Sequence, residues 1–260
     1  MRYTLSKPTK GTYSQSALTP GAQIQVGTRG AVYSGSMKGK NFKLKYGLTA
    51  AHVFEAEGDS VYFHDKQIGK CIVNIPQIDM LHSSLPLTFT VDMSFLELIL
   101  PPARYQLDVI QSDAITRRYN IRIWKQVIVE ANVVIVNRNR EMRFGKIVDV
   151  LCTVRSGNVM NALAITDERG TSAITEAGDS GALVTHLPGE QDDGVLDVLG
   201  IVVGVRNDGN GNSMTIANRL WDVLKLIGCD ERLRRRLYIG EPHPSEIKRF
   251  AEEEVDFAEE

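Results

Sequence analysis

The sequence predicts an all-β protein assembled from many short strands. Short apolar runs recur along most of its 260 residues, and several of them alternate apolar with polar side chains. Gly, Asn, Asp or Pro separates these runs, a punctuation that is typical of sandwiches and barrels. The composition, with 43% hydrophobic and 24% charged residues, is that of an ordinary globular protein with enough apolar side chains for a sizeable core.

The first group of strands is expected between residue 22 and a pair of prolines. Residues 1–20 are rich in Ser, Thr, Lys and Gly and are expected to form a flexible arm ahead of this group. Pro101 and Pro102 then interrupt the pattern, because proline is a strong breaker of regular structure, and the chain is expected to divide there into two parts. The expected strands are Gln23–Val26, Leu44–Thr49, Ser60–Phe63, Ile68–Val73 and Phe95–Leu100.

The second part repeats this style and closes with a helix. Leu220, Val223, Leu224 and Ile227 recur at helical spacing, and Gly228 is expected to stop that helix. A basic cluster around residues 232–236 and an acidic run to residue 260 follow, and charge runs of this kind are usually only solvated. The expected strands are Ile121–Trp124, Val127–Val136, Gly145–Val154, Ala162–Thr166, Gly181–Thr185 and Val198–Val205.

Three separate motifs supply the groups that activate a serine nucleophile. Ser180 lies between glycines in the run Gly-Asp-Ser-Gly at 178–181, and an apolar strand follows. His52 ends the run Leu-Thr-Ala-Ala-His at 48–52, and Asp92 stands before the run Met-Ser-Phe-Leu. A serine hydroxyl becomes nucleophilic when a histidine takes its proton and a carboxylate orients that histidine. The motifs together therefore predict a His-Asp-Ser triad.

These motifs, in the order His, Asp, Ser, resemble those of the chymotrypsin-like (trypsin-fold) serine proteases. The resemblance extends from about Gly21 to Gly228. It implies two six-stranded antiparallel β-barrels with a C-terminal helix. The periodicity of the strands alone does not distinguish one barrel from two. The first barrel would span residues 21–102 and hold His52 and Asp92. The second would span residues 103–228 with the closing helix and hold Ser180, and residues 229–260 would be a charged tail.

The resemblance also assigns a role to each residue. Ser180 would be the nucleophile, His52 the general base and then acid, and Asp92 the group that orients His52. The backbone N–H groups of Gly178 and Ser180 would form the oxyanion hole, in which one donor is typically worth about 2.7–4 kcal/mol of barrier. Asp179 would need a partner other than a newly cut N-terminus, because no Ile-Val-Gly-Gly run is present, and that partner stays open.

The other aspartates and histidines are weaker candidates for catalysis or metal binding. Asp59, Asp65 and Asp79 are rivals to Asp92 that lack its context, and Asp79 is the best of them. The remaining histidines share no metal-ligand spacing with a carboxylate or a cysteine, so no catalytic or metal role is expected for them. They are His64, His82, His186 and His243.

The specificity pocket is placed by the same resemblance. One wall would be Ile174, six positions before the nucleophile, and the other the strand Val203-Gly204-Val205. An apolar pocket of this kind favours medium-sized apolar side chains over Lys or Arg, because a buried cation without a partner is costly. Glu176 lies close to the expected pocket and is the one residue that would instead attract a basic side chain.

Charge and cysteine content exclude several partners. The net charge of −2 gives no whole-protein attraction to nucleic acid, and no apolar run approaches the length of a membrane span. Three widely spaced cysteines, Cys71, Cys152 and Cys229, form neither a disulfide framework nor a metal spacing, so no cofactor is expected. Because the N-terminus also lacks the apolar core of a signal peptide, a reducing, intracellular setting in the cytoplasm is expected.

The leading hypothesis is an intracellular trypsin-like serine endopeptidase that cleaves protein or peptide substrates through an acyl-enzyme. Two alternatives stay open. One is an inactive trypsin-fold module that only binds peptides, and the other is a polyprotein protease domain that mainly processes itself. The order of the motifs argues against an α/β-hydrolase esterase, in which serine precedes the acid and histidine. The oligomeric state and the physiological substrate stay open as well.

Overall fold

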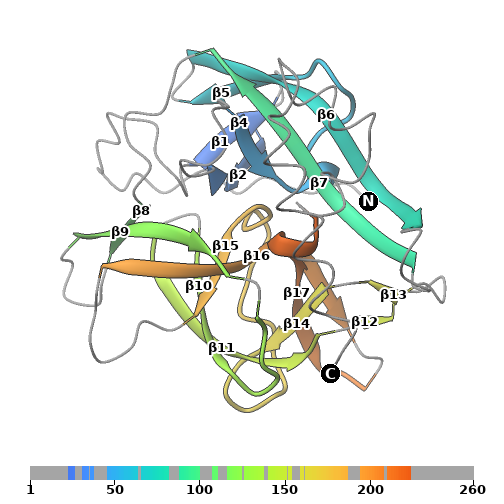
Figure 1. Ribbon diagram of the computed structural model, residues 1–260, viewed down its shortest axis with the longest axis vertical. Coiled ribbons are helices and arrows are strands. Elements are labelled where there is room, and N and C mark those ends of the chain that lie inside the picture. Colours follow the sequence, from blue (N-terminus) through green and yellow to red (C-terminus); the bar gives the residue numbers. More distant parts are fainter. Residues whose placement is uncertain are drawn as a thin grey trace, which may run out of the picture.

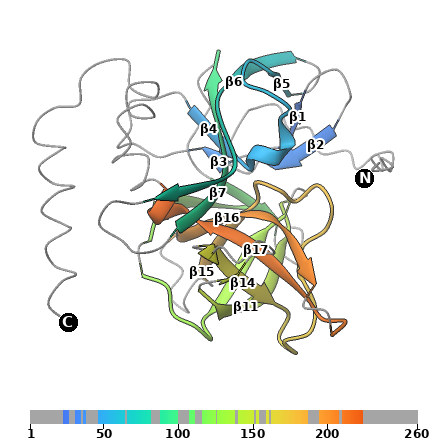
Figure 2. The ribbon, with the colours of Figure 1, turned by 90° about the vertical axis from the view of Figure 1, so that its right-hand side faces the viewer.

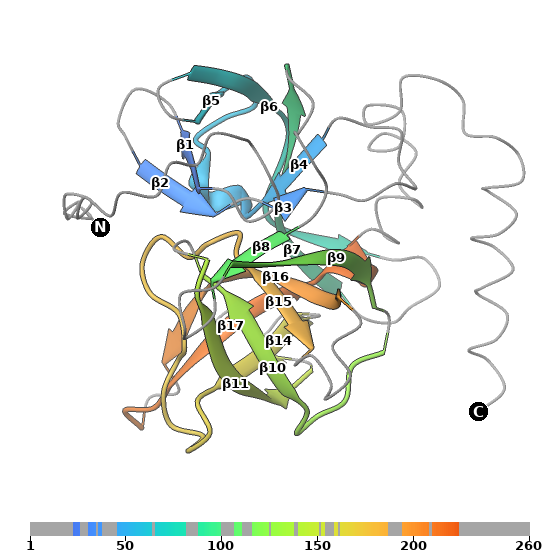
Figure 3. The ribbon, with the colours of Figure 1, turned by 90° about the vertical axis from the view of Figure 1, so that its left-hand side faces the viewer.

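The computed structural model divides into two β-rich halves that stack on one another (Figure 1). The first half contains β1–β7 and the second contains β8–β17, and the views in Figures 2 and 3 show the same two-layer arrangement. The structure describes residues 23–26, 31–34, 36–37, 46–63, 66–81, 88–99, 107–110, 116–124, 126–137, 140–150, 152–153, 159–160, 162–186, 194–207 and 210–223.

The first half is one antiparallel sheet with the strand order β2-β1-β5-β6-β7-β4-β3. β2 ends at Ser34 and β3 begins at Ser36, so the two ends of this order are adjoining segments of the chain. A short 3₁₀ helix, η1 (Ala51–Val53), follows β4 and carries His52. The strands are β1 (Gln23–Val26), β2 (Ala31–Ser34), β3 (Ser36–Met37), β4 (Tyr46–Thr49), β5 (Ser60–Phe63), β6 (Lys66–Leu81) and β7 (Thr88–Leu98).

The second half contains a closed six-stranded barrel. Its strands run in the order β15-β10-β11-β14-β17-β16, and a pairing of β15 with β16 closes it. β9 extends the sheet by pairing parallel with β16, and β8 pairs with β9. The strands are β8 (Leu107–Ile110), β9 (Thr116–Ile123), β10 (Asn132–Val136), β11 (Met142–Asp149), β14 (Ala162–Thr166), β15 (Leu183–His186), β16 (Val195–Asn207) and β17 (Ser213–Arg219), with β12 (Cys152–Thr153) and β13 (Val159–Met160) as a separate pair.

An apolar cluster joins the two halves. Each half has its own core, centred on residues such as Val61 and Leu96 in the first and Ile147 and Leu163 in the second. A further cluster of buried side chains draws on both halves, so their relative placement is fixed by apolar burial. Its members are Leu48, Val73, Ile75, Val91, Met93, Phe95, Leu107, Val109, Tyr119, Val136, Leu183, Leu196, Val198, Ile201, Leu220 and Val223.

The architecture confirms the predicted fold class, and the structure corrects several element bounds. β6 and β7 are far longer than expected and form a hairpin that reaches past the first half towards β13 (Figure 1). As a result Asp92 lies inside β7, not ahead of a strand. Residues 220–223 are helical, as expected. The rest of the predicted helix, the arm at 1–20, the boundary at 102 and the tail at 229–260 lie outside the described residues.

Candidate active site

Each of the three predicted triad residues comes from a different element. His52 lies in η1, Asp92 in β7, and Ser180 in the loop that leads into β15. Two glycines shape that loop, since Gly178 has φ of 95° and Gly181 has φ of 88°. These are left-handed values that glycine adopts without steric cost, so the chain can turn sharply on both sides of the serine.

The structure brings these three side chains into one hydrogen-bonded row. His52 Nδ1 lies 2.8 Å from Asp92 Oδ2, and His52 Nε2 lies 2.9 Å from Ser180 Oγ. A carboxylate only accepts hydrogen bonds, so Nδ1 is the protonated nitrogen and Nε2 of the neutral ring presents a lone pair to the serine. The geometry therefore allows the Ser180 proton to move to Nε2.

Asp92 is buried and held by several donors. Its side chain is only 2% exposed, while that of His52 is 40% exposed. The backbone N–H groups of Ala51 and His52 donate to Oδ1 at 2.7 and 3.0 Å. Burial of a carboxylate is costly unless hydrogen bonds replace its hydration, and these contacts supply that replacement.

The loop before Ser180 offers two unused N–H groups. Asp179 N donates to Glu176 O at 3.1 Å and Gly181 N donates to Val202 O at 2.8 Å. Within the described residues, neither Gly178 N–H nor Ser180 N–H takes part in a hydrogen bond. These are the two groups predicted to form an oxyanion hole, and both are available to an incoming oxygen atom.

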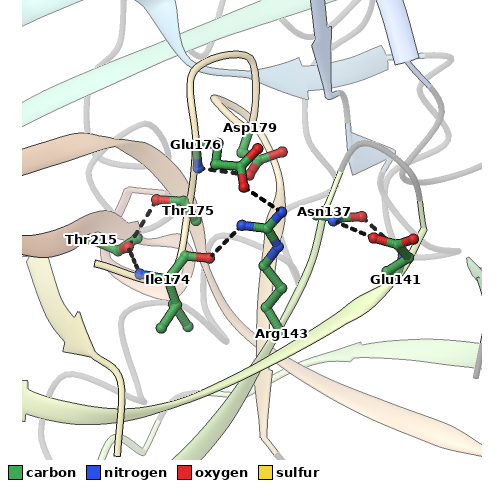
Figure 4. A network of polar contacts seen from close by, with 8 residues as sticks. All are labelled: Asn137, Glu141, Arg143, Ile174, Thr175, Glu176, Asp179 and Thr215. Atoms are coloured by element: carbon green, nitrogen blue, oxygen red, sulfur yellow. Dashed lines mark hydrogen bonds and ion pairs between the residues drawn. The ribbon is translucent and has the colours of Figure 1, made fainter. Parts of the chain in front are cut away.

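Glu176 is already paired. Arg143, on β11, places Nη2 2.9 Å from Glu176 Oε1 and makes a longer contact of 3.4 Å from Nη1 to the carbonyl of Ile174. Figure 4 shows this guanidinium reaching up to the loop from below. Glu176 N in turn donates to Asp179 Oδ2 at 3.0 Å. A row of contacts therefore connects β11 to the residue next to the nucleophile.

Ile174, predicted to be one wall of the specificity pocket, is almost fully buried, and its role in substrate binding stays a prediction. Its side chain is 9% exposed and belongs to the core of the second barrel. A Cβ atom built on Gly145 would lie only 2.6 Å from Ile174 Cδ1, so the isoleucine occupies the space that a larger residue on β11 would fill. Counting back six positions from the nucleophile identifies the loop but not the direction of this side chain.

The other predicted pocket residues lie on β16, directly after Val202, whose carbonyl accepts the N–H of Gly181. Val203 is half-buried between the core of the first half and a small cluster on β14 and β17. A Cβ added to Gly204 would meet no described atom, and Val205 is 51% exposed. The pairing of β15 with β16 reaches only Ile201, so within the described strands β16 has an unpaired edge from Val203 to Asn207.

The structure also places polar residues in the site that the sequence did not indicate. Thr215 Oγ1 accepts the N–H of Ile174 at 3.1 Å and lies 2.8 Å from Thr175 Oγ1, so hydroxyls on β17 fasten the nucleophile loop (Figure 4). Asn218, also on β17, donates from Nδ2 to the carbonyl of Asp92 at 2.8 Å. These pairs join segments far apart in sequence, and no local pattern marks them.

Asp59, one of the rival aspartates, has a structural role. Asp59 accepts the N–H groups of Glu55 and Ala56 and stabilises a turn. Asp65, His64, His82 and His243 lie outside the described residues, as does the side chain of Asp79. Among the residues that the structure describes, no group of three or more His, Cys, Asp or Glu could hold a metal ion. No helix in the same residues is long and apolar enough to cross a membrane.

Comparison with solved structures identifies the fold. The chain covers 96–98% of each of three solved protease structures and matches them over 81% of its own length. They are a serine protease specific for glutamic acid that uses a histidine triad in substrate binding (TM-score 0.54, 17% identity), Thermobifida fusca protease A (0.52, 15%) and Cellulomonas bogoriensis chymotrypsin (0.50, 16%). No family model and no curated protein sequence matches the chain. The chain has the two-barrel fold of the chymotrypsin-like serine proteases.

Proposed function

We propose that this protein is a serine endopeptidase that hydrolyses peptide bonds through His52, Asp92 and Ser180. The observation that carries the proposal is the row of two short hydrogen bonds, 2.8 Å from Asp92 to His52 and 2.9 Å from His52 to Ser180. The two unused N–H groups beside the serine support the same reading. A chymotrypsin-like fold around this row makes acyl transfer the reaction class that it fits best.

The chemistry follows from the position of each atom. Ser180 Oγ attacks the carbonyl carbon of the peptide bond while its proton moves to His52 Nε2, and Asp92 stabilises the resulting imidazolium. The carbonyl oxygen becomes negative and is bound by the N–H groups of Gly178 and Ser180. His52 then gives its proton to the leaving amine, and the C–N bond breaks. An acyl-enzyme on Ser180 remains.

The second half of the cycle repeats these steps with water. His52 removes a proton from a water molecule, whose oxygen attacks the acyl carbon. The same two N–H groups bind the second tetrahedral oxyanion. Ser180 Oγ leaves and regains a proton from His52, which restores the resting site and releases the new carboxyl end of the peptide.

The unpaired edge of β16 is proposed as the segment along which substrate lies. An extended peptide that adds to such an edge gains main-chain hydrogen bonds with little regard to sequence. Gly204 leaves room beside the edge, and Val205 offers an exposed apolar surface. Because Glu176 is paired with Arg143, the residue before the cut is proposed to be a medium-sized apolar one such as Leu, Met or Phe, not Lys or Arg.

The proposal extends to the setting in which the enzyme works. A free, buried thiol at Cys71 and the wide spacing of the three cysteines support a reducing, intracellular environment. The proposed partners are protein or peptide substrates.

The decisive experiment compares the wild-type protein with Ser180→Ala. The variant should keep the fold and lose peptide hydrolysis, by roughly a millionfold if it follows the nucleophile loss measured in another serine protease. A fluorophosphonate probe should label Ser180 in the wild type only. Hydrolysis by Ser180→Ala at the wild-type rate would refute the proposal, and an unlabelled, inactive wild type would favour a module that only binds peptides. A mass spectrum of both purified forms separates a self-processing domain from an enzyme that acts on other proteins.

A further inference from the structure

One buried amide crosses from the second half of the molecule to the first. Asn218, on β17, is fully buried and donates from Nδ2 to the backbone carbonyl of Asp92 at 2.8 Å. A carbonyl only accepts hydrogen bonds, so the atom of Asn218 that faces it is the NH₂ nitrogen. The contact therefore joins the barrel that carries Ser180 to the main chain of the aspartate that holds His52.

Asp92 lies where the strand ladder around it is least regular. The register between β6 and β7 shifts between Ile75 and Ile78, and Asp92 falls within that shift. On the other side of β7, the pairing with β4 stops at Ser94. The main chain at Asp92 is thus less tightly defined by sheet pairing than its neighbours, and Asn218 supplies a directional contact at this point.

The Asn218 amide lowers stability at this buried position. Asn218 lies on the same face of β17 as Ile216 and pairs with Ala162 on β14. Ile216 and Ala162 belong to an apolar cluster that also contains Ala164. Its Oδ1 is buried and accepts no hydrogen bond within the described residues. A buried polar atom without a partner lowers stability. Packing alone would be served better by an apolar side chain, so the useful part of this residue is its donor.

We propose that Asn218 is a positioning residue for Asp92. By fixing the main chain of the aspartate from the opposite barrel, it sets the direction of the carboxylate and hence the place of His52 relative to Ser180. Asn218 touches none of the reacting atoms, so its effect passes entirely through Asp92. This inference rests on the proposed function, in which the row from Asp92 to Ser180 performs the proton transfer.

The test replaces Asn218 by leucine, which has the same branched outline, a larger volume and no donor. The variant loses the unpaired Oδ1 of Asn218, and the Asp92 carbonyl loses its donor. Because overpacking lowers stability, we expect the melting temperature to fall modestly, while kcat per folded molecule falls by about 10- to 100-fold, as for a small misplacement of catalytic groups. KM should change little, because Asn218 does not contact substrate. Asn218→Ala serves if the leucine variant does not fold.

Thr185→Val is the matched control. Thr185 is also fully buried and donates from Oγ1 to a backbone carbonyl, that of Val134 at 3.3 Å, but both residues lie in the second barrel. Its loss should leave kcat unchanged. If Asn218→Leu also keeps the wild-type kcat, or if its only effect is a lower melting temperature with normal kcat per folded molecule, the proposal is overturned.

A second readout does not depend on turnover. The Nδ1–H proton of His52, bonded to Asp92, should give a far-downfield proton NMR signal that disappears in His52→Ala. We expect Asn218→Leu to shift or broaden this signal and Thr185→Val to leave it in place. If wild type and Ser180→Ala hydrolyse peptides equally, the proposed function is refuted. The NMR signal then tests the positioning role of Asn218 without reference to activity. An unchanged signal in Asn218→Leu would then refute the positioning role.

Discussion

At the scale of single residues, the proposed reaction depends on which nitrogen of His52 carries a proton. Nδ1 is bonded to Asp92, so Nε2 can accept the Ser180 proton only while the ring is neutral. His52→Ala should therefore be as inactive as Ser180→Ala when peptide hydrolysis is measured under the same conditions. An active His52→Ala would remove His52 from the mechanism.

The ion pair between Arg143 and Glu176 sets a second expectation at this scale. The guanidinium neutralises the one carboxylate that the sequence marked as a binder of Lys or Arg side chains. Arg143→Met keeps much of the apolar stem but frees Glu176, so we expect cleavage after Lys and Arg to increase severalfold in a peptide library. The double variant Arg143→Met/Glu176→Gln should lose that increase. Equal cut-site profiles for wild type and Arg143→Met would show that Glu176 does not face the substrate.

At the scale of elements, the end of β15 carries a histidine with an altered proton affinity. Burial lowers the pKa of His186, and nearby Asp197 offsets this only in part. The folded protein therefore binds the proton less readily than the unfolded chain, so protonation favours unfolding. We expect the free energy of unfolding to fall as pH drops below about 6.5, and to fall less in His186→Gln. Urea unfolding at neutral and mildly acidic pH measures this, and identical slopes for the two proteins would contradict it.

Local sequence patterns predicted some elements well and others poorly, for physical reasons. The end of the strand predicted over Val127–Val136 is correct, because Val133 to Val136 are apolar and pack inside, but β10 begins only at Asn132. β6 was predicted too short, because Pro76 and polar neighbours interrupt the apolar pattern before its end at Leu81. A strand in a long hairpin needs no apolar alternation where it leaves the core.

The same contrast holds within the site. His52, Asp92 and Ser180 could be proposed from the sequence because each stands in a short, distinctive motif, and the structure brings their side chains together. Arg143 and Asn218 were missed because each acts on a partner far along the chain, at separations of 33 and 126 residues. The direction of the Ile174 side chain could not be predicted, since it depends on packing against Gly145, a residue 29 positions earlier in the chain.

At the scale of the whole molecule, the apolar cluster between the two halves should determine stability. Leu107, on β8, is fully buried in this cluster. We expect Leu107→Ala to lower the free energy of unfolding by about 2–5 kcal/mol, because the cavity that remains adds to the lost burial. Ile99→Ala is the control, since Ile99 is 62% exposed and an exposed substitution usually changes this free energy by no more than about 0.5 kcal/mol. Equal denaturant midpoints for the two variants would show that the cluster contributes little.

The division of the proposed triad between the halves has a consequence for the newly made chain. The base and its aspartate belong to the first half, and the nucleophile belongs to the second. A partly folded chain with only one half in place would therefore hold either a histidine with nothing to activate or a serine with no base. The protein would hydrolyse peptides only once both halves have folded and docked, so a partly folded chain would cleave neither other proteins nor itself.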